Sequence, residues 1–300
     1  MAQKISIDDF DVSLIKRLSD RHFGIGCDQF ILLDYAEKYD IKMLIFNQDG
    51  SIAKSCGNAT RCVARYLFDK NRLTQIIIEA PDRHLQCVLV SDGQIAVNMG
   101  KAQFDLCFLD LDPSLLEIST SKGIDAKHIT KDDWELMICS LLPTHDFKVI
   151  KTGVFMGNPH LVLYFEHALW WKRIDICQWG QRIGQSPFFK NGINVGFLTV
   201  DEDADHKDLK RFRLKVYERG VGFTLACGSG ACAAYAALQK QILSDEDITK
   251  KQYFKNIKTP IDMIVDGGKL KLWHNEKHEI MMQGPAEYSF KGFFKEGSFN

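Results

Sequence analysis

Hydrophobic and polar positions follow the same order twice along the chain. An apolar strand is predicted over 41–46 and ends at Asn47; Cys56 follows nine residues later and leads into a helical pattern. In the second half, alternating apolar and polar residues predict a strand over 212–217 that ends at Glu218. Cys227 again follows nine residues later, before an alanine-rich helix over 231–243. Two similar units predict two similar domains with a site between them.

Each unit has a hairpin signal after its helix, Asp92-Gly93 in the first and Asp266-Gly267 in the second, and then closes with 97–100 or 281–284. We expect an N-terminal domain over 1–105, a linker or irregular segment over 106–146 and a C-terminal domain over 147–285. Residues from about 286 to the end are expected to return to the first domain. Val149 to Phe165 is predicted to form two strands around the turn at 157–160.

Composition narrows the class of protein. The chain has 300 residues, 45% of them hydrophobic and 26% charged, which is typical of a soluble globular protein. Its formal net charge is −1, so the chain lacks the excess of positive charge that binds nucleic acid or an anionic membrane surface. Neither is expected as a partner. No apolar run is long enough to span a membrane, and the first residues do not form a signal peptide, which predicts a cytoplasmic protein.

The nine cysteines include no C-x-x-C pair, so free thiols in a reducing compartment are expected, most of them buried. Cys62 and Cys232 follow the first cysteine of their motifs by six and five residues. On a helix neither spacing puts the two side chains on one face, so we expect no metal site and place both residues in the core.

The two Cys-Gly pairs carry the candidate chemistry. Each lies where a helix begins, and a helix N-terminus lowers the pKa of a thiol and offers unpaired N–H groups to an anion such as a carboxylate. The N–H groups in question belong to Gly57-Asn58 and Gly228-Ser229. A lone cysteine of this kind is more often a buried structural thiol, but the repetition argues against that. Two thiols on opposite sides of one carbon suit two-base racemisation.

Several motifs, in order, resemble those of diaminopimelate epimerases. Residues 46–51 with Cys56-Gly57-Asn58 and Arg61-Cys62 resemble the family's first cysteine motif, and 218–222 with 226–232 resemble the second. Four shorter segments also match: Gly24-Ile25-Gly26-Cys27-Asp28-Gln29, Gly157-Asn158-Pro159-His160, Asn194-Val195-Gly196-Phe197 and Gly284-Pro285-Ala286. The resemblance covers nearly the whole chain.

The resemblance implies an α+β fold of two pseudo-symmetric domains. Each is a strongly curved, mostly antiparallel sheet or barrel around a central helix, with the active site in the interdomain cleft. It implies a cofactor-independent isomerase, acting as a homodimer, that interconverts LL- and meso-diaminopimelate for lysine and peptidoglycan precursor synthesis. Cys56 and Cys227 inherit the catalytic roles, assisted by His160 and Glu218. The implied substrate contacts are Gln29, Asn47, Gly57, Asn58, Asn158, Asn194, Glu218, Arg219, Gly228 and Ser229.

The chain also departs from the family pattern. The family normally opens with a strand and a Gly-x-Gly-Asn-Asp-Phe loop, and no such segment precedes Gln29. Ala59 stands where a glycine is usual, and Phe223 where a glutamate is common. Two alternatives therefore remain open: a related racemase or isomerase of the same fold, such as a proline racemase-like enzyme, or a shortened, inactive remnant.

Overall fold

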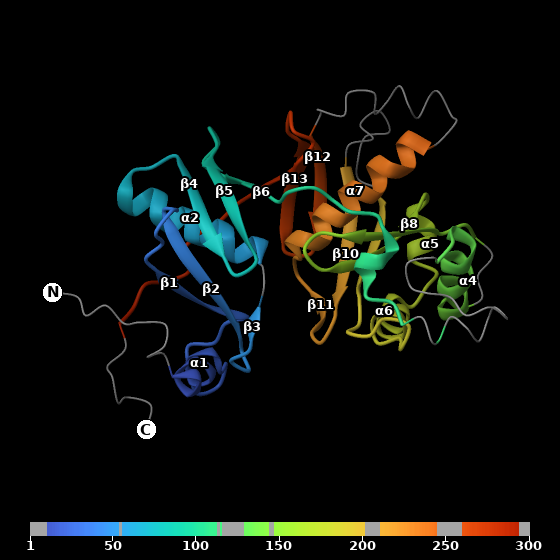
Figure 1. Cartoon of the computed structure of the whole chain (residues 1–300), viewed down its shortest axis with the longest axis horizontal. Helices are drawn as coiled ribbons and strands as arrows, with labels where there is room; N and C mark the ends of the chain where they lie inside the picture. The colour runs from blue at the N-terminus through green and yellow to red at the C-terminus, as the bar shows by residue number, and fades with distance from the viewer. Residues whose placement is uncertain are drawn as a thin grey trace. The chain divides into compact units, whose positions relative to one another are not determined.

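The computed structural model describes residues 11–53, 56–112, 115, 129–143, 147–201, 211–244 and 260–293. Two compact units are present (Figure 1). Unit 1 contains the described residues up to Asn98 and those from Gly284 onward, and unit 2 contains those from Met99 to Gln283.

In its described residues, unit 1 is a mixed sheet with two helices. Its elements are α1 (Val12–Ser19), β1 (Gln29–Asp34), β2 (Ile41–Asn47), β3 (Ile52–Ala53), α2 (Gly57–Asn71), β4 (Gln75–Ala80), β5 (Arg83–Leu89) and β6 (Ile95–Asn98). The strand order is β1-β2-β4-β5-β6, with β3 paired to β2. The pairing of β2 with β4 is parallel, and the other pairings within this unit are antiparallel.

Unit 2 is larger. Its elements are η2 (Leu106–Leu109), α4 (Lys131–Leu141), β7 (Ile150–Phe155), β8 (Pro159–Phe165), α5 (Ala168–Trp171), α6 (Ile176–Gly184), β9 (Asn194–Val200), β10 (Arg211–Glu218), β11 (Gly222–Thr224), α7 (Gly228–Ser244), β12 (Ile261–Val265), β13 (Gly268–His274) and β14 (Ile280–Gly284). The strand order is β14-β13-β12-β10-β9-β8-β7, with β11 paired to β10. β10 is parallel to β12, and β8 is parallel to β9.

The repeat predicted from the sequence is confirmed as a repeat of topology. In unit 1, β2 pairs with the short strand β3, the chain crosses over through α2, and β4 returns parallel to β2 before β5 and β6 follow antiparallel. In unit 2, β10, β11, α7, β12, β13 and β14 repeat this plan. The predicted hairpins also form, and the two-residue loop at Asp266-Gly267 sets Val265 opposite Gly268.

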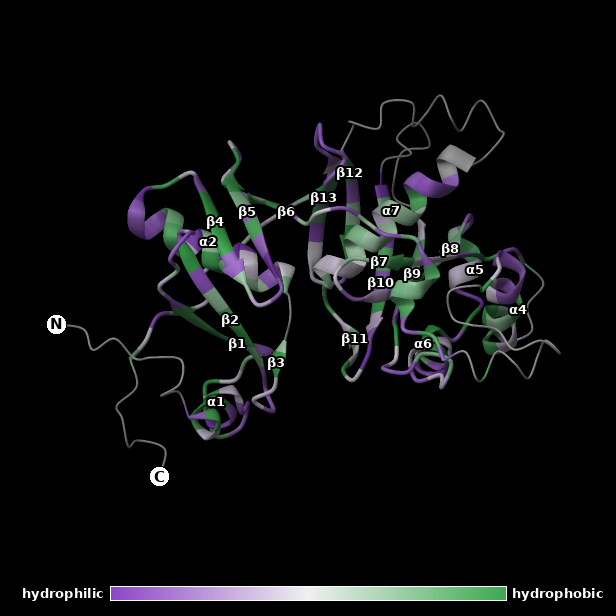
Figure 2. Ribbon diagram, viewed as in Figure 1, coloured by the Kyte–Doolittle hydropathy of each residue, from purple (hydrophilic) through white to green (hydrophobic). Residues whose placement is uncertain are grey.

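The helix of each repeat packs against its own sheet. α7 contacts β7, β8, β9, β10 and β13, so the sheet of unit 2 curves around it. All residues from Ala231 to Leu238 are buried, and a helix that is apolar all round belongs in a core. Figure 2 shows apolar residues along α7 and the neighbouring strands. α2 contacts β4, β5 and β6 and keeps one face exposed.

The segment expected to be a linker contributes to the core of unit 2. Leu109 of η2 and Trp134, Ile138 and Leu141 of α4 belong to the same buried cluster as strands β8 and β9. Thr130 and Asp133 form a capping box that starts α4. The apolar face of α4 stabilises this segment by packing against the sheet, so the segment is part of the folded unit and not only a linker. Residues 113–114, 116–128 and 144–146 of this stretch lie outside the described residues.

Two expectations about cysteines are wrong. Cys62 is exposed, whereas the neighbouring Arg61 is buried. The buried face of α2 is therefore rotated from the predicted one, because the Arg61 guanidinium finds polar partners inside: Nη2 donates to Asn58 Oδ1 at 2.9 Å and Nε to the Pro285 carbonyl at 3.2 Å. Only three of the nine cysteines are buried, namely Cys87, Cys227 and Cys232.

All nine cysteines lie in the described part of the chain, and none forms a disulfide. No helix in the described ranges combines the length and apolar composition of a membrane span.

Candidate functional site

Cys56 and Cys227 have the same place in their repeats. Cys56 is the N-cap of α2 in extended conformation, and its Sγ accepts a hydrogen bond from the Ala59 N–H at 3.4 Å. Cys227 directly precedes α7, and its Sγ accepts from the Gly230 N–H at 3.4 Å. Each sulfur thus takes the role of an N-cap side chain, accepting from the amide three residues on.

The cap places each sulfur beside the open end of a helix. Gly57 and Asn58 are the first two residues of α2, and Gly228 and Ser229 are the first two of α7. First-turn N–H groups have no acceptor within their own helix, and the helix dipole is positive at this end. The prediction that each Cys-Gly pair lies at a helix start is confirmed, and binding of an anion by these N–H groups stays a prediction.

The surroundings of Cys227 correct one expectation. Its side chain is buried, and burial raises the pKa of the Cys227 thiol, because the charged form loses its hydration. The Glu218 carboxylate raises that pKa further, while Ser229, whose Oγ lies 3.6 Å from Sγ, and the Gly230 N–H act in the opposite direction. The prediction that the pKa of the thiol at this helix start lies below its ordinary value is therefore wrong for Cys227. Desolvation outweighs the helix end.

In unit 2 the strand register gathers polar side chains at one end of the sheet. His160 on β8 lies opposite Asn194 on β9. Val195 lies opposite Tyr217 on β10, which puts Asn194 next to the end of β10 at Glu218. The three strands therefore deliver His160, Asn194 and Glu218 to the same part of the sheet.

Asn194 is buried, and the oxygen of its side-chain amide already accepts a hydrogen bond. Its Oδ1 accepts from the Arg219 backbone N–H at 3.0 Å, so the side chain is left with its NH₂ group as a donor to a ligand. The Arg219 guanidinium donates to the Asn191 carbonyl at 3.1 Å, but the side chain is exposed and keeps further N–H groups for a carboxylate.

His160 is buried and neutral. Its Nε2 pairs with Asn158 Oδ1 at 2.9 Å, and its Nδ1 has no hydrogen-bond partner among the residues that the structure describes. Burial, assisted by the charge of Arg219, lowers the pKa of His160 from 6.5 to about 3. Since the carboxamide oxygen requires a donor, Nε2 carries the proton and Nδ1 is an acceptor without a donor.

Thr224 is a site residue that the sequence reasoning missed. It lies on β11, opposite Val216 of β10, and its hydroxyl donates to Glu218 Oε1. A short strand that folds back beside Glu218 just before Cys227 was the signal that could have found it.

In unit 1 the predicted residues form two polar groups. Gln29 lies opposite Asn47, and its Nε2 donates to Asn47 Oδ1 at 3.4 Å. Asn47 Nδ2 in turn donates to Ser51 Oγ at 3.0 Å. At the start of α2, Asn58 is held by Arg61, so the buried guanidinium fixes the side chain that follows the Cys-Gly pair.

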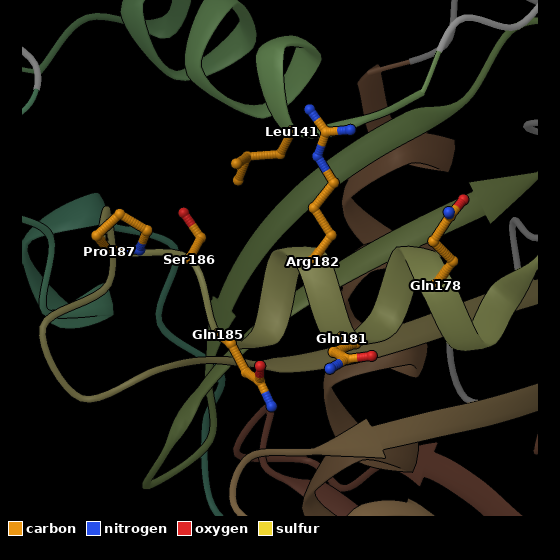
Figure 3. A pocket seen from close by; sticks show the side chains of 7 residues that line it. All are labelled: Leu141, Gln178, Gln181, Arg182, Gln185, Ser186 and Pro187. Atoms are coloured by element: carbon orange, nitrogen blue, oxygen red, sulfur yellow. The ribbon is translucent and has the colours of Figure 1, made fainter.

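A cavity of unit 2 is lined by none of these residues. It has a volume of about 460 Å³ and lies between α4 and α6, as Figure 3 shows. Its lining residues are Leu141, Gln178, Gln181, Arg182, Gln185, Ser186 and Pro187, none of which the sequence singled out. Arg182 is engaged there with the Ser140 carbonyl near the end of α4. Within the described ranges, no cluster of three or more His, Cys, Asp or Glu side chains could hold a metal ion.

Comparison with known sequences gives a consistent result. The model of the family described as Diaminopimelate epimerase matches residues 3–105 and 152–289. The Diaminopimelate epimerase of Rickettsia bellii (strain OSU 85-389) is 33% identical over 287 residues, which cover 95% of this chain and 88% of the relative. That of Pseudomonas syringae pv. syringae (strain B728a) is 33% identical over 283 residues, which cover 92% of this chain and 87% of the relative.

Solved structures agree on the fold. A phenazine biosynthesis protein of the PhzF family from Bacillus anthracis has a TM-score of 0.56 at 14% identity, covering 92% of this chain and 86% of its own. A hydroxyproline epimerase from Agrobacterium vitis has a TM-score of 0.51 at 13% identity, covering 90% of this chain and 76% of its own. At such identities the likeness concerns the fold alone, and it confirms the expected α+β architecture. By its sequence, matched over most of its length, the chain belongs to the diaminopimelate epimerase family.

Proposed function

We propose that this protein interconverts LL- and meso-diaminopimelate without a cofactor, using Cys56 and Cys227 as a two-base pair. One thiolate removes the proton from the α-carbon, and the opposite thiol returns a proton to the other face of the carbanion. The observation that carries the proposal is the shared cap: each sulfur accepts from the amide three residues on, at 3.4 Å in both repeats. Relatives at 33% identity that bear the name Diaminopimelate epimerase support the choice of substrate.

The two thiols differ in burial, and we give them different roles in the first turnover. Cys227 is buried beside Glu218, so it rests as a neutral thiol and is the proton donor in the first turnover. Cys56 is half-buried, and it acts as the base in that direction. In the reverse direction the roles exchange, because a two-base racemase ends each turnover with the proton on the other group.

The polar residues fit a substrate with two amino acid groups. The helix starts at Gly57-Asn58 and Gly228-Ser229 supply N–H groups that stabilise a carboxylate as negative charge develops at the adjacent carbon. In unit 2, the NH₂ of Asn194, the amide of Asn158 and the Arg219 guanidinium favour binding of carboxylate oxygens.

The remaining substrate-binding residues fit the ammonium groups. Glu218, assigned also to assist the Cys227 thiol, is an acceptor for a positively charged ammonium. Gln29 and Asn47 in unit 1 offer both donor and acceptor atoms to the second amino acid group. His160 Nδ1, a buried acceptor, can accept a hydrogen bond from the substrate or from a thiol.

Proton exchange in heavy water tests the proposal directly. The reduced protein is incubated with LL-diaminopimelate in D₂O, and loss of the α-proton signal is followed by NMR together with formation of the meso isomer. We expect both. A folded, reduced protein that exchanges no α-proton would refute the proposal and favour a binding protein. Exchange of proline or hydroxyproline, but not of diaminopimelate, would instead favour the related racemases.

Single variants test the two-thiol assignment. Cys56→Ser and Cys227→Ser should each reduce epimerisation by about 10²-fold or more, because removing a proton-transfer group costs at least that factor. Cys62→Ser is the matched control, since Cys62 is exposed and lies on the same helix, six residues after Cys56. Near-normal turnover in either catalytic variant would contradict the assignment.

The proposal includes a cellular setting. Nine cysteines without a disulfide suit a reducing compartment, which supports a cytoplasmic enzyme. A homodimer is proposed from family resemblance, and sedimentation at several protein concentrations tests it.

A further inference from the structure

The hairpin β10/β11 places three side chains on one face. Glu218 lies opposite Gly222, and Val216 lies opposite Thr224. Residues two apart on a strand share a face, and directly opposed residues of an antiparallel pair do too. Val216, Glu218 and Thr224 therefore point the same way, and the Thr224 hydroxyl donates to Glu218 Oε1.

This face lies against the start of α7. A Cβ built on Gly230 would be 2.9 Å from Val216 Cγ2 and 3.2 Å from Cys227 Sγ, so Val216 and the sulfur border the same small space. The negative charge of the Glu218 carboxylate acts on the Cys227 thiol and disfavours its ionisation. Thr224 is thus hydrogen-bonded to the carboxylate whose charge acts on the Cys227 thiol.

The Glu218 side chain would be poorly constrained without the hydrogen bond from Thr224. Glu218 is the last residue of β10 and only half-buried, and its side chain has three rotatable bonds. The glycines that follow, Gly220 and Gly222, have φ values of +75° and +94°, so the backbone reverses sharply and returns β11 alongside. Phe223 anchors the returning strand, with its ring 6.0 Å from Phe197 and 5.5 Å from Tyr217. The hydroxyl of Thr224 is therefore carried on a firmly packed strand.

We propose that Thr224 is a positioning residue whose hydroxyl holds one oxygen of Glu218, so that the carboxylate faces the thiol of Cys227. As a consequence, Cys227 stays a protonated thiol until it donates its proton to the substrate carbanion. The inference rests on the proposed function for the role of Cys227 in proton transfer. The positioning itself is a property of the resting protein, and it can be measured without substrate.

Alkylation of Cys227 measures this positioning. The full-length reduced protein reacts with iodoacetamide at several pH values between about 7 and 9.5, and the rate at Cys227 is read by peptide mass spectrometry, because the thiolate is the reactive form. Thr224→Val keeps the shape and removes the hydroxyl. We expect its carboxylate to turn toward solvent and the Cys227 rate at about pH 8 to rise about tenfold, since losing the neighbouring negative charge lowers the pKa of the thiol and raises the thiolate fraction. Thr224→Ser should restore the wild-type rate.

A double variant shows whether Thr224 acts through Glu218. Glu218→Gln alone should also raise the Cys227 rate, and adding Thr224→Val to it should change nothing further. If Thr224→Val instead opened access to the sulfur, its effect would persist in the Glu218→Gln background. The proposal would be overturned if the effect persisted in that background, or if Cys227 of Thr224→Val were alkylated at the wild-type rate.

Thr199→Val is the matched control. The hydroxyl of Thr199 is buried in the same unit and donates to the Phe165 carbonyl at 2.9 Å, so its loss removes a structural hydrogen bond. Its Cys227 rate should equal that of wild type, and a tenfold rise there would count against a specific role for Thr224. If wild type exchanged no diaminopimelate proton, the proposed function would fail, but the alkylation result would stand independently.

Discussion

The buried histidine of unit 2 makes a quantitative prediction about acid stability. His160 is 1% exposed, and its pKa is lowered from 6.5 to about 3, first by burial and then by the charge of Arg219. In the unfolded chain the imidazole takes up a proton near its ordinary pKa, whereas the folded protein resists protonation until far lower pH. The stabilisation from the neutral, buried imidazole is therefore fully present above pH 6.5 and is lost progressively as pH falls toward 3.

The size of the effect follows from the gap between the two pKa values. At about pH 5, about 1.5 pH units below the ordinary pKa, protonation has stabilised the unfolded state by about 1.4 kcal/mol for each pH unit, so the free energy of unfolding falls by about 2 kcal/mol. That is a large part of the net stability of a typical domain. His160→Gln removes the titrating group and keeps a side-chain N–H for the Asn158 oxygen, so this variant should not show that part of the loss.

Tryptophan fluorescence provides the assay, because all of the chain's tryptophans lie in the unit that contains His160. They are Trp134, Trp170, Trp171, Trp179 and Trp273. Urea unfolding at about pH 7.5 and about pH 5, followed by this signal, gives the change in unfolding free energy for each protein. We expect wild type to lose about 2 kcal/mol more than His160→Gln between the two conditions. His22→Gln, at an exposed histidine of unit 1, is the control and should behave as wild type.

Equal losses in wild type and His160→Gln would refute the reasoning. That result would mean that the imidazole is hydrated or charged in the folded state, and the assignment of Nδ1 as a buried acceptor would have to be withdrawn.

Three further substitutions test the packing around the candidate site. Gly230→Ala should destabilise unit 2 by about 1–3 kcal/mol, since its methyl would meet Val216 at 2.9 Å and Cys227 Sγ at 3.2 Å; a stabilised variant in the same urea assay would contradict the tight approach. Asp201→Ala removes a buried carboxylate that pairs with two arginines at 2.9 and 3.0 Å, and we expect a loss of about 2–4 kcal/mol in that assay, with no loss meaning that the pairs are solvated. Arg61→Met should cost about 1–3 kcal/mol by leaving two acceptors without their donor, and it should accelerate hydrogen exchange at the start of α2; unchanged exchange would show that other groups hold this turn.

Local patterns predicted the architecture well. The alternation over 212–217, the apolar run over 41–46 and the Asp-Gly pairs are short-range signals, and each corresponds to an element of the structure. The order of those elements, repeated around Cys56 and Cys227, predicted the duplicated topology. Such signals succeed because strand pairing, turns and helix starts depend on neighbouring residues.

Burial was predicted less well, because it depends on distant parts of the chain. Arg61 is buried because the Pro285 carbonyl, 224 residues away, accepts from it, and no pattern within α2 indicates that partner. The stretch around Trp134 looks irregular in sequence, yet α4 is covered by residues of β8 and β9.

The sequence by itself determined which residues are the candidates for the chemistry: two cysteines at helix starts, each preceded by a strand that ends in a polar residue nine positions earlier. Only the tertiary structure decided how those groups behave. Cys227 keeps its proton because packing excludes water from it and the β10/β11 hairpin brings Glu218 beside it, so desolvation and a neighbouring charge outweigh the helix end that the sequence shows. A pKa depends on every group within a few ångströms, and folding chooses those groups from across the chain.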